Sequence, residues 1–188
     1  MAYPLETTIE LYRWTVEEYH RLAEAGILDE DSPVELLNGQ IIRMSPAGDQ
    51  HAACIDRLDE LFRDILGKTV NIRIQSPVSL DALSEPEPDI AILKRKDNFY
   101  ADGHPRPEDT LLLVEVADST VEKDRTFKKV AYASAGITEY WIVNIPGRQV
   151  EQYLQPIGES YQLGHIYKAS QSLESPVAGT VRVIDILP

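Results

Sequence analysis

The sequence is short of cysteine, of apolar runs and of basic residues, and each shortage excludes a class of protein. Its 188 residues include one cysteine, so Cys54 cannot form an internal disulfide or a multi-cysteine metal site. No apolar run reaches the roughly 18 residues that a membrane-spanning helix needs. The start, MAYPLETTIELYRW, carries acidic residues and no basic-then-apolar export signal. We therefore expect a cytoplasmic protein with no membrane association.

Basic residues are outnumbered, with 18 Lys and Arg against 31 Asp and Glu and a net charge of −13. Such a surface as a whole repels phosphate backbones. Two local exceptions are Lys94-Arg95-Lys96 and the stretch from Lys123 to Lys129, although short basic clusters are also typical of solvated surface. A function on nucleic acids would have to depend on such local exceptions.

Local patterns predict a sheet flanked by helices. A capping pattern, an Asn-Gly turn and glycine stops delimit most of the elements. The chain length suits one domain, and the order of elements is typical of an α/β or α+β protein. The predicted elements are a helix from Thr15 with Glu18 in its capping box to Gly26, a hairpin turning at Asn38-Gly39, a helix from Gly48 or Asp49 to Gly67, strands over 69–80 and 88–95, a loop over 96–109, a strand over 111–117, a helix over 121–136, a strand pair turning at Pro146-Gly147 and short C-terminal strands.

Three acidic residues lie in or beside predicted strands. Residues 111–117, LLLVEVA, are apolar on both faces, as in a central strand, yet they contain Glu115. An unpaired carboxylate buried there would cost several kcal/mol. Glu35 lies inside PVELLNG, and Asp89 follows a proline and heads the apolar stretch IAIL. Each of these two also fits an ordinary charge at a strand end or sheet edge.

If two such acids converge, they either share a proton or bind a cation. Mg²⁺ typically takes one or two carboxylates plus waters, which leaves a position for a substrate oxygen. Metal-assisted attack on a phosphodiester also needs a group that orients or deprotonates water, commonly a lysine.

The helix over 121–136 offers two lysines, and helical spacing separates them. At about 100° per residue, one packed face carries most of the small and apolar side chains. Lys128 flanks that face in an i, i+4 row with Asp124 and Tyr132, whereas Lys129 points towards solvent. The alternative is that Lys128 is a surface lysine paired with Asp124. The expected packed face comprises Phe127, Val130, Ala131, Ser134 and Ala135.

The motifs EPEPDIAIL, LLVEVADST and DRTFKKVAYASAGITEYWIVN, preceded by VELLNGQIIRMSPAGDQH, resemble the Uma-type family of bacterial endonucleases over roughly residues 14–153. The resemblance implies a single restriction-endonuclease-like domain over 1–188, with a central mixed sheet flanked by helices and a PD-(D/E)xK site. Pro88-Asp89 match the PD of that motif, Glu115 matches its second acid, and Glu35 corresponds to the early glutamate of the fold.

The lysine of the simple motif is displaced, because Ala117 occupies its position and Lys128 matches the family's lysine on the following helix. The resemblance implies that Asp89, Glu115 and the carbonyl of Val116 bind Mg²⁺ or Mn²⁺. Lys128 would position or activate the attacking water, and Glu35 would bind the ion through water or hold Lys128. The candidate substrate contacts are His51, Gln75 and Tyr132.

The predicted reaction is hydrolysis of DNA phosphodiester bonds. A non-catalytic interaction module that retains the fold is the main alternative, and the net charge of −13 favours it. A separate DNA-binding partner or a basic loop would reconcile that charge with cleavage. Homodimerisation is a further alternative, because cutting both strands of a DNA duplex needs two sites and the predicted C-terminal β-strands offer an edge for pairing. A glycosidase acid pair ranks last, because aromatic residues make up only 7% of the chain.

Overall fold

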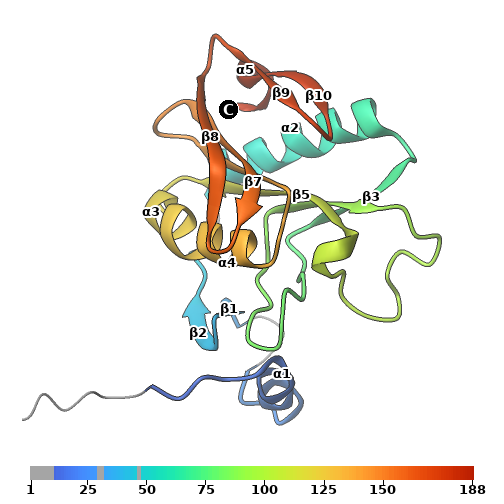
Figure 1. Ribbon diagram of the computed structural model, residues 1–188, viewed down its shortest axis with the longest axis vertical. Helices are drawn as coiled ribbons and strands as arrows, with labels where there is room; N and C mark the ends of the chain where they lie inside the picture. Colours follow the sequence, from blue (N-terminus) through green and yellow to red (C-terminus); the bar gives the residue numbers. More distant parts are fainter. Residues whose placement is uncertain (1–10, 29–31, 46–47) are drawn as a thin grey trace, which may run out of the picture.

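A computed structural model describes residues 11–28, 32–45 and 48–188. A six-stranded sheet forms its centre, in the order β3-β4-β5-β6-β7-β8 (Figure 1). β5 and β6 are parallel, and the other neighbours are antiparallel. The strands are β3 (Val70–Ile74), β4 (Ile90–Lys94), β5 (Thr110–Ala117), β6 (Glu139–Asn144), β7 (Gln149–Ile157) and β8 (Ser160–Lys168).

The central strand β5 is covered on both faces, as its apolar sequence predicts. Leu112, Val114 and Val116 lie in one buried cluster, whereas Leu113 and Ala117 lie in another on the opposite face. The alternation of side chains along a strand produces this division. Glu115 therefore points to the same face as Leu113 and Ala117.

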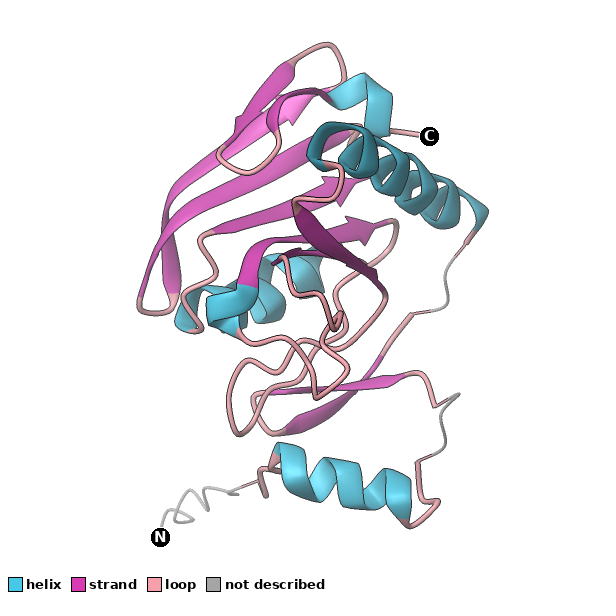
Figure 2. Cartoon of the chain, turned by 90° about the vertical axis from the view of Figure 1, so that its right-hand side faces the viewer, coloured by secondary structure: helices cyan, strands magenta, loops and turns pink. Residues whose placement is uncertain are grey.

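Helices cover the two faces of the sheet (Figure 2). Apolar side chains at helical spacing pack α2 against the face that carries Val114. The opposite face receives the helical stretch that follows β5, through Tyr132 and Ala131. The first face is covered by α2 (Asp49–Leu66), α5 (Val183–Ile186) and the hairpin of β9 (Ser172–Ser175) and β10 (Gly179–Arg182), and the second by α3 (Val121–Lys123), the π-helical turn η2 (Asp124–Lys128) and α4 (Lys129–Ser134).

The N-terminal elements lie at the end of the molecule opposite α2 and α5 (Figure 2). Helix α1 (Val16–Glu24) begins with the predicted capping box, in which Thr15 Oγ1 accepts a hydrogen bond from Glu18 N. The next two strands, β1 (Val34–Leu37) and β2 (Gln40–Arg43), form the predicted hairpin. Asn38 and Gly39 have φ values of 52° and 75°, which the favoured two-residue turn requires.

The predicted fold class is confirmed: a mixed sheet is flanked by helices, with antiparallel strands towards the C-terminus. None of the described helices is long and apolar enough to cross a membrane. Residues 1–10, which carry most of the acidic N-terminal stretch, lie outside the described part of the chain.

Two predicted elements are shorter than expected. The strand expected over 69–80 ends at Ile74, because Gln75 has a φ of +43° and Pro77 has no backbone N–H to donate. The helix expected over 121–136 is divided by η2, where Lys129 N donates to Asp124 O. The loop over 96–109 contains one short 3-10 turn, η1 (Pro107–Asp109).

Candidate active site

A cavity of about 380 Å³ opens where β4 begins and β5 ends. It brings together side chains from the hairpin, the start of α2, the segment before β4, the end of β5 and the helical stretch after it. The residues that line it include Gly48, His51, Gln75, Glu87, Asp89, Glu115, Val116, Asp118, Thr120, Lys123, Asp124 and Lys128.

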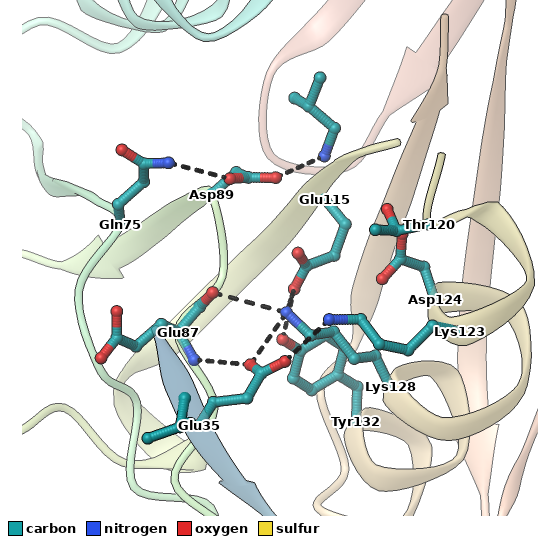
Figure 3. A network of polar contacts seen from close by, with 12 residues as sticks. Glu35, Gln75, Glu87, Asp89, Glu115, Thr120, Lys123, Asp124, Lys128 and Tyr132 are labelled. Carbon is teal, nitrogen blue, oxygen red and sulfur yellow. Dashed lines mark hydrogen bonds and ion pairs between the residues drawn. The ribbon is translucent and has the colours of Figure 1, made fainter. Parts of the chain in front are cut away.

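Asp89 is held in place directly beside β5. Its Oδ2 accepts hydrogen bonds from Val116 N at 2.8 Å and His51 Nε2 at 3.2 Å. Gln75 Nε2 donates to Oδ1 at 3.4 Å (Figure 3). The hydrogen bond with Asp89 raises the pKa of His51. His51 and Gln75 thus contact the acid of the PD pair.

Glu115 projects from β5 towards η2 and is only 4% exposed. Its Oε1 accepts hydrogen bonds from Lys128 Nζ at 2.9 Å and Tyr132 Oη at 2.6 Å (Figure 3). Burial raises the pKa of Glu115 to about 8, and neighbouring carboxylates, led by Asp89, add to the rise against the opposing effect of Lys128. The buried acid in the apolar strand therefore has a cationic partner and also an unusually high proton affinity.

Lys128 is 3% exposed and directs its ammonium group into a ring of oxygen atoms. Nζ lies 2.9 Å from Glu115 Oε1, 3.1 Å from Glu35 Oε2 and 3.5 Å from the carbonyl of Glu87. Burial acts to lower the pKa of Lys128, but Glu115, Glu35 and Asp124 hold it above its usual value. Lys128 is therefore charged.

Glu35 closes the other side of this network and is fully buried in β1. Lys123 Nζ lies 3.1 Å from its Oε1, and Glu87 N donates to Oε2 at 3.2 Å. Burial acts to raise the pKa of Glu35, but Lys128 and Lys123 lower it below the usual value. Glu35 therefore remains ionised between two lysines (Figure 3).

The packed face predicted for the helix after β5 is partly wrong. Phe127 is 59% exposed and Val130 is 39% exposed, whereas the row of Asp124, Lys128 and Tyr132 is buried. The extra residue per turn in η2 rotates the side chains away from the 100° spacing of an α-helix. Lys128 lies at the centre of the buried row. The predicted solvent-facing residue Lys129 is partly buried, with Nζ 4.9 Å from the centre of the Tyr153 ring.

The alternative pairing of Lys128 with Asp124 does not occur as an ion pair in the described structure. The Asp124 carboxylate instead accepts a hydrogen bond from Thr120 Oγ1 at 2.8 Å.

Tyr132, predicted as a substrate contact, is fully buried and does not line the cavity. The sequence analysis did not identify Lys123 as a second partner of Glu35. The one sequence feature that points to Lys123 is its position five residues before Lys128.

Asp89 and Glu115 form a donor set that suits a hard divalent cation. Within the described residues, Glu115 Oε2 accepts no hydrogen bond although Glu115 lines the cavity. In the same described part of the chain, Asp89 Oδ1 has only the long contact to Gln75. Two carboxylates with room for water are the ligands that Mg²⁺ commonly uses in proteins, so these two residues fit such an ion.

A family model for Uma2, described as "Putative restriction endonuclease", matches residues 16–183. The chain belongs to the Uma2 family. A crystal structure from Anabaena variabilis, described as a "putative nuclease belonging to DUF820", is similar with a TM-score of 0.69 and 14% identity, over 92% of this chain and 96% of that chain. That likeness shows the shared fold. None of the curated proteins compared matches this chain. The Uma2 assignment supports a nuclease-like function.

Proposed function

We propose that this Uma2 protein is a divalent-metal-dependent endonuclease that hydrolyses DNA phosphodiester bonds. The observation that carries the proposal is the convergence of Asp89 and Glu115 on one cavity, with Lys128 bonded to Glu115. Burial also raises the pKa of the Glu115 carboxyl to about 8. Perturbed acids in a cavity are typical of functional sites.

Asp89, Glu115 and the carbonyl of Val116 would hold Mg²⁺ or Mn²⁺. When bound, the ion would supply positive charge that polarises the phosphoryl group and a water molecule. Glu115 must be ionised to act as a ligand, so it gives up its proton on binding. Tyr132 orients the Glu115 carboxylate, and His51 and Gln75 orient that of Asp89. These residues are positioning residues in the proposal.

Lys128 acts as a charged donor and not as a base, because its pKa is raised. Its ammonium group has three hydrogen-bond donors, and three oxygen atoms already lie within 3.5 Å of it. Glu115 would bind the ion through Oε2, which accepts no hydrogen bond within the described residues, while Oε1 keeps its contact with Lys128. The ammonium charge of Lys128 beside the cavity would orient the attacking water or stabilise charge on the phosphoryl oxygens. Glu35 keeps the ammonium group in place throughout.

DNA binding by a chain with a net charge of −13 requires local positive charge at the site. Lys123 and Lys128 both line the cavity, although Glu35 partly neutralises them. We propose that additional positive charge comes from a second copy of the chain or from a separate DNA-binding partner. The closed network around Lys128 favours the second candidate function, a non-catalytic module that retains the nuclease fold.

Nicking of supercoiled plasmid DNA in Mg²⁺ or Mn²⁺ separates the two candidates. The parent should nick DNA only with metal, and Asp89→Asn should lose that activity. Asp97→Asn is the matched control, because Asp97 is fully exposed and, among the described residues, pairs only with Arg95. Metal-dependent nicking that Asp89→Asn abolishes and Asp97→Asn retains supports the enzyme. The absence of nicking by the parent under both metals would favour the module.

A further inference from the structure

A second cluster of metal-ligating side chains lies outside the candidate active site. His20 comes from α1, Glu85 from the segment before β4, and His104 from the loop over 96–109. Their ligand atoms all lie within 4.8 Å of one another. They line a separate hollow of about 580 Å³ beside the start of α1.

The three side chains retain most of their capacity to bind a ligand. Glu85 is 4% exposed, and its Oε1 lies 2.5 Å from His20 Nε2. Within the described residues this is the one side-chain partner of the Glu85 carboxylate, and the imidazole of His104 makes no hydrogen bond. A buried carboxylate usually needs fuller compensation by hydrogen bonds or charge. Two neighbouring imidazoles and one under-compensated carboxylate together indicate a cation site.

We propose that His20, Glu85 and His104 bind Zn²⁺. Imidazole nitrogens favour zinc over Mg²⁺, and two histidines with one glutamate form a recognised zinc donor set. Zinc bonds of about 2.1 Å in tetrahedral geometry place ligand atoms ~3.4 Å apart. The distance between Glu85 Oε1 and His20 Nε2 therefore has to increase by about 1 Å when the ion binds. The partly exposed histidines permit that adjustment, and water takes the fourth position.

The zinc ion joins three segments that are distant in the sequence. Helix α1 is already tied to the segment before β4, because Val16 N donates to Ala82 O at 2.8 Å. Glu85 N donates to Leu36 O at 2.8 Å, next to Glu35. His104 adds the loop over 96–109, which is also tied to the segment before β4 because Ser79 N donates to Pro105 O at 3.0 Å. Zinc therefore stabilises this end of the molecule independently of any ion at Asp89.

Calorimetric titration of the full chain with ZnCl₂, in excess Mg²⁺ to occupy harder oxygen sites, tests the proposal. The parent should bind one zinc ion. His104→Ala should weaken binding at least tenfold, because loss of a direct ligand exceeds the roughly 10–100-fold effect of losing an outer partner. His165→Ala is the matched control, since His165 is an exposed histidine on β8.

Two further measurements separate ligation from damage to the fold. Zinc should raise the Tm of the parent and of His165→Ala but not that of His104→Ala, whose exposed side chain makes no hydrogen bond that the fold requires. Glu85→Gln, which keeps the size of the side chain, should weaken zinc binding similarly. Failure of the parent to bind zinc, or equal affinity in the parent and His104→Ala, would overturn the site.

Discussion

Replacement of Glu115 by glutamine should stabilise the folded protein in metal-free buffer while removing a proposed metal ligand. Glutamine keeps a carbonyl oxygen that can accept hydrogen bonds from Lys128 and Tyr132, as Glu115 Oε1 does. It also removes the cost of a buried negative charge. The expected gain follows from the pKa of Glu115, which burial raises from 4.5 to about 8.

The stabilisation expected from Glu115→Gln depends on pH. Below pH 4.5 the carboxyl is protonated in both the folded and unfolded states, so the substitution changes little. Between pH 4.5 and 8 only the unfolded chain ionises, and the folded protein loses about 1.4 kcal/mol per pH unit. The penalty reaches about 3 kcal/mol at pH 7 and ~5 kcal/mol above pH 8. At pH 7 the substitution should raise the Tm by roughly 6–12 °C.

Urea denaturation of the parent and Glu115→Gln at several pH values, in EDTA, measures this difference. Glu151→Gln is a control of opposite sign. Burial acts to raise the pKa of Glu151, but hydrogen bonds from Arg125, Gln149 and Tyr153 hold it at about 2. Glu151 therefore stabilises the fold above pH 4.5, and that contribution disappears as the pH falls towards 2. The reasoning would be refuted if Glu115→Gln were less stable than the parent at pH 8. It would also be refuted if the substitution changed the free energy of unfolding equally at pH 4 and pH 8.

Three further predictions concern the same site. Lys128→Ala should abolish plasmid nicking yet retain Mn²⁺ binding, whereas Lys129→Ala should remain active; the reverse pattern would assign the role to the other lysine. Mn²⁺ affinity, measured by calorimetry, should rise about tenfold per pH unit up to pH 8 and then level off, because binding displaces one proton from Glu115; a flat profile would contradict that proton release. Tyr132→Phe removes a hydrogen bond that stabilises the ionised Glu115 carboxylate. The pH at which Mn²⁺ affinity stops rising should therefore be higher in this variant, and an unchanged pH dependence would exclude a positioning role for Tyr132.

Short-range signals predicted much of the fold. The Thr15–Glu18 capping box, the Asn38-Gly39 turn and the Gly67 stop depend on a few adjacent residues, and the structure contains all three. The apolar character of both faces of β5 likewise predicted a central covered strand. These features need no knowledge of distant contacts.

The arrangement around Lys128 could not be derived from spacing alone. A π-helical turn leaves no clear sequence signature, so the 100° rule assigned the packed face to Phe127 and Val130, which the structure exposes. Lys128 reaches Glu35 across 93 residues of sequence; the family resemblance offered this contact as one of two roles for Glu35, but residue spacing gave no sign of it. The cluster of His20, Glu85 and His104 likewise comes from three segments that are distant in the sequence, so residue spacing gives no sign of it.

The central claim is that Asp89 and Glu115 share one divalent ion. Calorimetric titration with MnCl₂ at pH 8.5 tests it most directly, in the parent, Asp89→Asn and Glu115→Gln, with Asp97→Asn as the control. The account predicts one Mn²⁺ per chain in the parent and control, and loss of that binding in both site variants. Failure of the parent to bind Mn²⁺, or binding that neither site variant changes, would contradict it.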